Sequence, residues 1–139
     1  LIWVPVFGIA FYTLDHVYIN RRRRGRQMES IRALAAKTSQ GKSVYIFPGG
    51  KRAPDGRLGE WKKGAFVMAI ELGLPVLPVA IADSSKLHGI GDVAVTPGTV
   101  TLRIGRAIPT TGLSYEDRDA LLQRVRDAVE ELLDHDTVE

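Results

Sequence analysis

The spacing of hydrophobic positions in the first part of the chain predicts strands that alternate with helices. The short runs 17–19 and 43–47 are rich in β-branched and aromatic residues, which is typical of strands. Between them, the segment 27–39 carries apolar residues at helical spacing and stops before Gly41: Met28, Ile31, Leu34 and Ala35. We therefore expect the order strand, helix, strand up to Pro48.

A second helix and a further strand are expected next. Residues 62–72 are apolar on nearly every side, which predicts a buried helix with Gly73 as its natural end. Residues 75–81 indicate a strand, and Pro78 makes its interior irregular or places it near an edge. Together with strand 43–47 these elements would form a βαβ unit, in which the two strands pair in parallel through a right-handed crossover.

The last third of the chain predicts one strand and one long amphipathic helix. Residues 99–104 alternate between polar and apolar side chains, as a half-exposed strand does. Ser114, followed three residues later by Asp117, resembles a capping box at the start of the helix. The opposite face of this helix is acidic, and its apolar stripe consists of Leu121, Leu122, Val125, Ala128, Val129, Leu132 and Leu133.

These elements predict a single α/β domain, residues 1–139, with a mixed, partly parallel sheet flanked by helices. A chain of 139 residues with 45% hydrophobic and 25% charged residues is long enough to bury a core. It has no cysteine, which excludes disulfides, thiolate metal sites and cysteine nucleophiles. The three histidines lie far apart in the sequence, so we expect no metal site.

The first twelve residues are almost entirely apolar. They include Pro5 and follow no basic segment, which is unlike a signal peptide. The run is also shorter than the ~20 residues that span a bilayer. We expect a buried or membrane-surface segment of a protein whose start lies upstream of Leu1.

Positive charge is concentrated in the first half of the chain. Residues 1–63 hold 13 Lys and Arg against 4 Asp and Glu, a net +9, whereas residues 64–139 hold 6 against 12, a net −6. The densest part is the arginine run 21–26, which would contact phosphates of nucleic acid or anionic lipid headgroups, or simply be solvated. No aromatic residues interleave with these arginines, which disfavours nucleic acid as a partner.

The glycine-rich loop 48–61 is the best candidate for a binding site. It joins the end of one predicted strand to the start of the next predicted helix, where α/β sheets place ligands. Glycines let backbone N–H groups approach an anion, and a helix N-terminus attracts negative charge. Lys62 and Lys63 oppose the helix dipole there by about 0.3–1 kcal/mol each. A phosphate held by Lys62, Arg52 and Lys51 would offset this cost, and the alternative is two lysines that extend into water.

Nucleotide and esterase motifs are absent. Gly50 and Lys51 are followed by Arg52, and Tyr45 stands where a P-loop requires its first glycine. The chain also lacks the dinucleotide-binding glycine pattern and the nucleophile elbow of serine esterases. Nucleotide hydrolysis and serine esterase chemistry are therefore disfavoured.

Three sequence blocks, within residues 3–21, 45–69 and 74–81, together resemble the 1-acyl-glycerol-3-phosphate acyltransferase family. The block "YIFPGGKR…GRLGEWKKGAFVMA" (45–69) resembles the family's Phe-Pro-Glu-Gly-Thr-Arg signature and the aromatic, lysine and Gly-Ala-Phe that follow it. The block "LPVLPVAI" (74–81) is similar to a later Val-Pro-Val-type block, and "WVPVFGIAFYTLDHVYINR" (3–21) is similar to an earlier one. The blocks occur in the family's order and extend the likeness to about residue 110.

The resemblance implies transfer of a fatty acyl group from a coenzyme A or acyl carrier protein thioester to a lysophospholipid, typically forming phosphatidic acid. It implies no cofactor beyond that thioester, and a protein at the cytoplasmic face of the cell membrane. Arg21, Gly50, Arg52 and the lysine of the Trp61-Lys62-Lys63 step would hold the acceptor phosphate. With the flanking loop positions, the candidate substrate-binding residues are Arg21, Gly49, Gly50, Lys51, Arg52, Lys62 and Lys63.

Two departures from the family pattern bear on activity. The family's His, four residues, Asp block, which supplies the general base, is not in this chain, and we expect it upstream of Leu1. Gly49 stands where the family has glutamate, and Lys51 where it has threonine. Losing that carboxylate removes a charge-assisted interaction of ~1.5–3 kcal/mol. The alternative is therefore a non-catalytic relative that binds phosphate or lipid headgroups.

Overall fold

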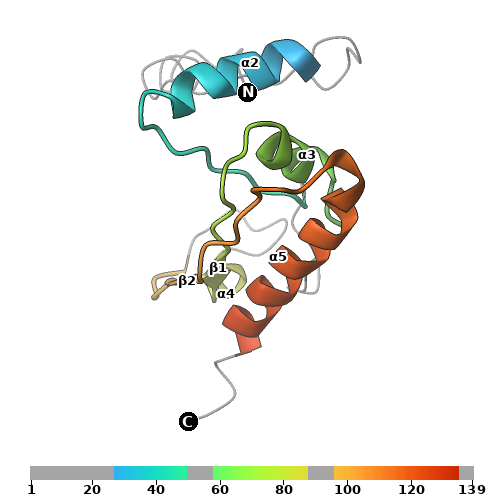
Figure 1. The fold of residues 1–139 in the computed structure, drawn as a ribbon. Helices are drawn as coiled ribbons and strands as arrows, with labels where there is room; N and C mark the ends of the chain where they lie inside the picture. Colours follow the sequence, from blue (N-terminus) through green and yellow to red (C-terminus); the bar gives the residue numbers. More distant parts are fainter. Residues whose placement is uncertain (1–26, 50–57, 88–95, 135–139) are drawn as a thin grey trace. The chain divides into compact units, whose positions relative to one another are not determined.

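The structure is a computed structural model that describes residues 27–49, 58–87 and 96–134 (Figure 1). The chain divides into two compact units, residues 1–45 and 46–139, and each is considered by itself. The predicted strand 17–19, the apolar segment 1–12 and the arginine run lie outside the described residues. That the chain forms one acyltransferase domain stays a prediction.

Helix α2, Gln27–Thr38, is the described element of the first unit and confirms the predicted helix. It ends where the sequence indicated, because Gly41 adopts a φ of 77°, which favours glycine. The Gly41 N–H donates to the carbonyl of Thr38, and the Lys42 N–H donates to that of Lys37. These two bonds satisfy carbonyls of the last turn, as in a Schellman motif.

The prediction of a strand at 43–47 is wrong for this structure. These residues have no regular secondary structure, and the apolar side chains of Val44, Tyr45, Ile46 and Phe47 are exposed. A strand exists only where a neighbouring strand accepts and donates its backbone hydrogen bonds, and within the described residues no strand lies beside this segment. The parallel pairing of the predicted βαβ unit is consequently not found in the described part of the chain.

Helix α3, Gly64–Glu71, confirms the second predicted helix and begins two residues later than expected. Its C-terminal end repeats the geometry of α2. Gly73 has a φ of 61° and donates its N–H to Ile70, while the Leu74 N–H donates to Ala69. Glycine at this position therefore ends the helix for the reason that the sequence suggested.

The sheet that the structure describes has two antiparallel strands, β1 (Val79–Ala82) and β2 (Thr101–Ile104). Val79 pairs with Ile104, and Ala82 pairs with Thr101. Before β1, Pro78 interrupts the ladder because it lacks an N–H, yet its carbonyl accepts a hydrogen bond from Gly105 at 2.9 Å. The pairing resumes beyond it at an isolated bridge, Val76 to Ile108. Pro78 makes this strand irregular, as predicted; the short helix α4, Ser84–Leu87, follows β1.

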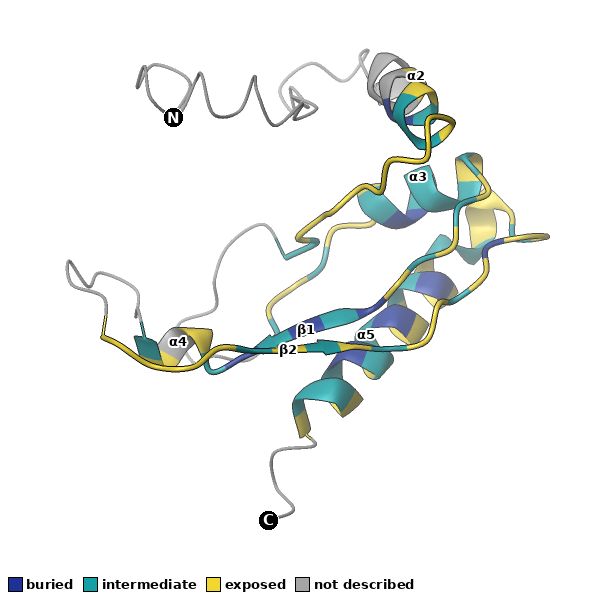
Figure 2. Cartoon of the chain, turned by 90° about the vertical axis from the view of Figure 1, so that its left-hand side faces the viewer, coloured by how far each residue is buried: buried dark blue, intermediate teal, exposed yellow. Residues whose placement is uncertain are grey.

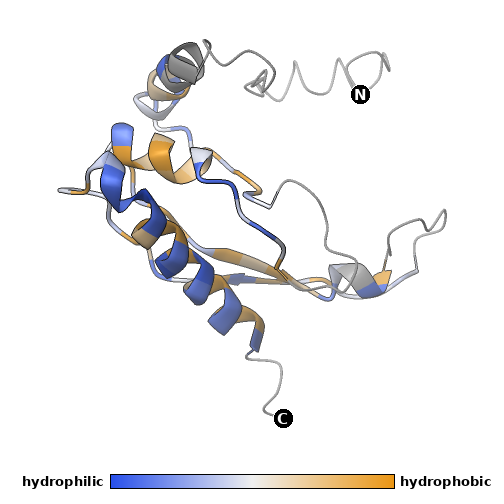
Figure 3. Ribbon diagram, turned by 90° about the vertical axis from the view of Figure 1, so that its right-hand side faces the viewer, coloured by the Kyte–Doolittle hydropathy of each residue, from blue (hydrophilic) through white to orange (hydrophobic). Residues whose placement is uncertain are grey.

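The long helix α5, Arg118–Asp134, packs along one face of this sheet and against α3 (Figure 2). The short 3-10 helix η2, Tyr115–Asp117, leads into it. Polar residues gather on one side of α5 and apolar residues on the other (Figure 3). The core cluster joins Phe66 of α3 to Leu121 and Val125 of α5, with Trp61 packed against it. The predicted apolar stripe of this helix is confirmed.

The apolar residues of β2 point away from α5. Leu102 and Ile104 are 57% and 60% exposed, whereas Arg103 between them is half-buried. Arg103 donates from Nη1 to the carbonyl of Leu132 at 2.8 Å, close to the negative end of the α5 dipole. The strand is half-exposed as predicted, and Arg103 rather than an apolar side chain contacts the helix. None of the described helices is long and apolar enough to cross a membrane.

Candidate functional site

The two ends of the glycine-rich loop meet at one backbone hydrogen bond. The N–H of Lys62 donates to the carbonyl of Pro48 at 3.1 Å. This bond, which we call the loop neck, brings Gly49 and Lys62 to the same place although twelve residues separate them. Both predicted site residues therefore lie where the loop closes, directly before α3.

Within the described residues, the N-terminus of α3 has no side-chain cap. Lys63 occupies the N-cap position in helical geometry and makes no side-chain capping bond, and the first turn holds no acidic residue. Gly64 is exposed, and a Cβ built at this position would meet no atom within 4 Å. Phe66 and Val67 each donate their N–H to the Lys63 carbonyl at 3.1 Å, and within the described residues no acceptor is found for the N–H groups of Gly64 and Ala65, which is an arrangement that suits an anion.

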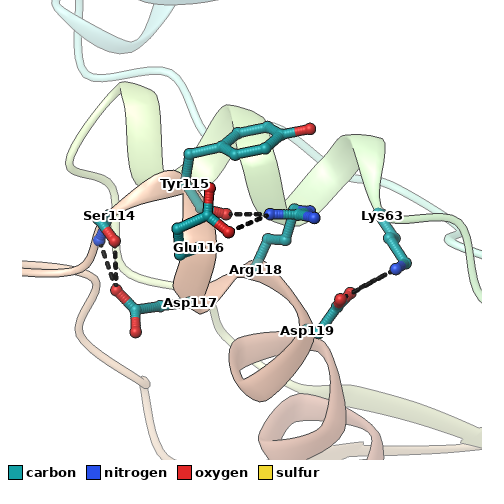
Figure 4. A network of polar contacts seen from close by, with 7 residues as sticks. All are labelled: Lys63, Ser114, Tyr115, Glu116, Asp117, Arg118 and Asp119. Atoms are coloured by element: carbon teal, nitrogen blue, oxygen red, sulfur yellow. Dashed lines mark hydrogen bonds and ion pairs between the residues drawn. The ribbon is translucent and has the colours of Figure 1, made fainter.

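Lys63 is already paired with a carboxylate of this chain (Figure 4). Its Nζ lies 2.8 Å from Oδ1 and 2.9 Å from Oδ2 of Asp119, in the first turn of α5. The hydrogen bond from Lys63 holds the pKa of the Asp119 carboxyl below its ordinary value of 3.8. Asp119 thus supplies for Lys63 the counter-charge that the sequence analysis expected from a bound anion.

Lys62 differs from its neighbour. Its side chain is exposed, and among the residues that the structure describes its ammonium has no ion-pair partner. Two adjacent lysines that look equivalent in the sequence are therefore distinguished by the structure. Lys63 links α3 to α5, and Lys62 carries a positive charge at the neck that no described carboxylate neutralises.

The position of Asp119 depends on the capped start of η2 and α5. The Asp117 carboxylate accepts a hydrogen bond from the Ser114 N–H at 2.7 Å and another from its hydroxyl at 2.8 Å (Figure 4). The backbone bond, and then the hydroxyl bond, lower the pKa of Asp117. The guanidinium of Arg118 lies 4.1 Å from the ring centroid of Tyr115. The predicted capping box is confirmed, and it fixes the turn that presents Asp119 to Lys63.

The structure brings together three of the seven predicted site residues, Gly49, Lys62 and Lys63. The other four, Arg21, Gly50, Lys51 and Arg52, lie outside the described residues, so their role stays a prediction. Sequence reasoning missed Asp119, the partner of Lys63. It sits on the polar face of a predicted helix, 56 positions along the chain, and no local pattern sets it apart from the other acidic residues there.

Comparisons with known proteins identify relatives of this chain. A family model described as Acyltransferase matches residues 1–82. Human 1-acyl-sn-glycerol-3-phosphate acyltransferase beta is 32% identical over 123 residues, which are 88% of this chain and 44% of the human protein. The putative 1-acyl-sn-glycerol-3-phosphate acyltransferase acl-2 of Caenorhabditis elegans is 31% identical over 93% of this chain and 46% of its own length. The chain therefore spans less than half the length of these relatives.

A solved structure shares the fold. The crystal structure of the 1-acyl-sn-glycerophosphate (LPA) acyltransferase PlsC from Thermotoga maritima has a TM-score of 0.72 to this chain at 32% identity. The match covers 95% of this chain and 53% of that one. This likeness confirms the predicted acyltransferase-like α/β fold. The chain belongs to the acyltransferase family, and the relatives that match most of its length are 1-acyl-sn-glycerol-3-phosphate acyltransferases.

Proposed function

We propose that this chain is the acceptor-binding part of an enzyme that transfers a fatty acyl group to the hydroxyl of a lysophospholipid, with 1-acyl-glycerol-3-phosphate as the acceptor and phosphatidic acid as the product. The acyl donor would be an acyl-CoA or acyl carrier protein thioester. The names of the relatives support the reaction class. The observation that carries the assignment is that, among the described residues, the α3 N-terminus has no side-chain cap and Lys62 at the loop neck has no ion-pair partner.

In this reaction the acceptor hydroxyl attacks the thioester carbonyl, an ester bond forms, and the carbon–sulfur bond breaks to release a thiol. The hydroxyl proton passes to a general base, which the resemblance assigns to the His/Asp block expected upstream. The residues of this chain would bind the acceptor phosphate and hold its glycerol hydroxyl in place. We assign the direct phosphate contact to Lys62 and the first N–H groups of α3, and we give Lys63 a supporting role through Asp119.

A lysine comparison tests this assignment. The variants Lys62→Gln and Lys63→Gln would be titrated with 1-acyl-glycerol-3-phosphate in mixed micelles. Removing a charge-assisted hydrogen bond costs ~1.5–3 kcal/mol, so Lys62→Gln should weaken binding about 10- to 150-fold. Lys63→Gln should have a smaller effect because its charge is shared with Asp119. Arg124→Gln, an exposed change on α5, is the matched control. Equal losses for the two lysines would contradict the assignment.

The hypothesis that the protein is an acyltransferase enzyme is tested on the full-length protein. It would be given an acyl thioester and 1-acyl-glycerol-3-phosphate, and thiol release and phosphatidic acid would be measured together. Stoichiometric release of both products is expected. Tight binding of the acceptor without thiol release would instead identify a non-catalytic relative that binds phosphate or lipid headgroups, a reading that Gly49 in place of glutamate favours.

Membrane association belongs to the same proposal. The apolar residues 1–14 and the arginine run would lie against the cytoplasmic face of the cell membrane, where each basic residue contributes about 1 kcal/mol near an anionic surface. Co-sedimentation with anionic vesicles that falls as salt rises is the expected result. Retention on DNA rather than vesicles at moderate salt would argue against it. Activity in the presence of a chelator would test the expectation that no cofactor is needed.

A further inference from the structure

The segment 58–61, which leads from the glycine-rich loop into the neck, is not held by secondary structure. Among the described residues, no backbone-to-backbone hydrogen bond involves Leu58, Gly59, Glu60 or Trp61. The first such bond after the loop is the neck itself, from Lys62 to Pro48. Within the described residues, side-chain contacts are therefore what holds the backbone that leads to Lys62.

Arg126 of α5 makes the polar contacts to this segment. Its Nη1 donates to the carbonyl of Gly59 and its Nη2 to the carbonyl of Leu58, both at 2.8 Å. Its Nε donates to the Glu130 carboxylate at 2.9 Å, one helical turn further along. All three guanidinium nitrogens are thus engaged, and the planar fork of arginine holds two successive carbonyls at once.

Trp61 anchors the same segment to the core. Its ring stacks on Phe66 at a centroid distance of 6.1 Å and an interplanar angle of 11°. The Arg126 guanidinium lies 5.7 Å from the Trp61 ring centroid, within the range of a cation–π contact. Phe66 is 3% exposed and belongs to the cluster with Leu121 and Val125. One end of the segment is therefore fixed by carbonyl contacts and the other by an aromatic anchor.

We do not expect Arg126 to contact the substrate directly, because its guanidinium is engaged within the chain. Glu130 pairs with its Nε, and Nη1 and Nη2 each donate to a backbone carbonyl of the chain itself. A long-range attraction of the phosphate by Arg126 is weakened by that carboxylate. What Arg126 contributes is geometry, because the two carbonyls it holds lie three and four positions before Lys62.

We propose that Arg126 is a positioning residue for the acceptor phosphate, acting through the segment 58–61 to hold Lys62 and the start of α3 at the loop neck. This rests on the proposed function of that neck. Replacing the guanidinium fork by lysine keeps the charge but loses the simultaneous contact with two carbonyls. Arg126→Lys should therefore behave like Arg126→Gln rather than like the wild type.

The experiment uses the whole chain and measures two properties of each variant. Hydrogen exchange is followed at the amide of Lys62, the donor of the neck bond, and at the buried Val129 of α5 as a report on global stability. Affinity is measured for 1-acyl-glycerol-3-phosphate in mixed micelles. Arg124→Gln is again the matched control, since it removes an arginine from an exposed position of the same helix.

Both Arg126 variants should raise exchange at Lys62 about tenfold and weaken acceptor binding by a similar factor, while exchange at Val129 stays within about twofold of the wild type. Wild-type affinity in Arg126→Lys, or a loss of protection that is equal at Lys62 and Val129, would overturn the proposal while leaving the proposed function intact. If the wild-type chain bound no acceptor, the proposed function would fall, and the role of Arg126 in it as well.

Discussion

Thr110 offers a sharp test of how α3 is held against the rest of the second unit. It is 2% exposed, and its hydroxyl donates to the carbonyl of Leu74 at 3.0 Å, with the carbonyl of Ala69 at 3.4 Å. The Ala69 carbonyl already accepts the Leu74 N–H, whereas no described backbone N–H serves the Leu74 carbonyl. Thr110 is therefore the hydrogen-bond partner of a carbonyl at the end of α3.

Thr110→Val replaces the hydroxyl by a methyl group of nearly the same shape. It should lower the free energy of unfolding by ~1–3 kcal/mol, because the partly buried Leu74 carbonyl loses its hydrogen-bond partner. Thr110→Ser keeps the hydroxyl and deletes one methyl group, which should cost only about 0.8 kcal/mol. The comparison separates the hydrogen bond from the packing at a single position.

Urea denaturation of the three proteins, followed by circular dichroism, measures the difference. The midpoints should fall in the order wild type, Thr110→Ser, Thr110→Val, at an unchanged slope. A Thr110→Val protein as stable as Thr110→Ser would refute the reasoning, since it would show that the Leu74 carbonyl does not depend on the hydroxyl. A changed slope would instead mean that the denatured state had been altered.

Three further predictions concern the core, the ion pair and the cap. Leu121→Ala should destabilise the chain by ~2–5 kcal/mol in the same urea assay, because Leu121 is 1% exposed in the core cluster; a loss under 1 kcal/mol would contradict that burial. The lowered pKa of Asp119 means that its contribution to stability is present above its ordinary value of 3.8 and is lost as pH falls through the folded pKa. Asp119→Asn should therefore reduce the fall in the free energy of unfolding that the wild type shows between about pH 5 and 2. If the free energy of unfolding falls equally steeply with pH in both proteins, the ion pair with Lys63 does not contribute. Ser114→Ala, which removes the hydroxyl bond to Asp117 and leaves the backbone N–H bond, should cost ~0.5–2 kcal/mol and reduce helical circular dichroism. Unchanged stability and circular dichroism would show that the hydroxyl bond does not support the start of α5.

The parts of the fold that were predictable from sequence are those decided within a few residues. Gly41 and Gly73 end α2 and α3 because both helix ends require a positive φ, which is a local demand that glycine meets. The apolar stripe of α5 could also be predicted from the sequence, since the helical spacing of apolar residues within one segment defines it. Pro78 disturbed its strand as expected because it lacks an N–H.

The features that escaped prediction depend on partners distant in sequence. The segment 43–47 has the composition of a strand, but composition does not supply the neighbouring strand that such a segment needs. Lys63 and Asp119 are 56 positions apart, and Arg126 and Gly59 are 67 apart. A polar residue on the outer face of a helix looks the same in the sequence whether it meets water or another segment. The difference between Lys62 and Lys63 could therefore be seen only in three dimensions.

The loop neck also bears on how this site can change during evolution. Residues 49–61 lie between two backbone groups that are hydrogen-bonded to each other, so the helix start does not depend on the length of chain that joins them. The entropy cost of closing a loop grows only with the logarithm of its length, and a doubling costs about 0.6 kcal/mol. Insertions and deletions between the two ends should therefore lower the free energy of unfolding less than the loss of a core residue does. Under the proposed function, changes in the loop would alter the preferred acceptor while Lys62 at its exit stays in place.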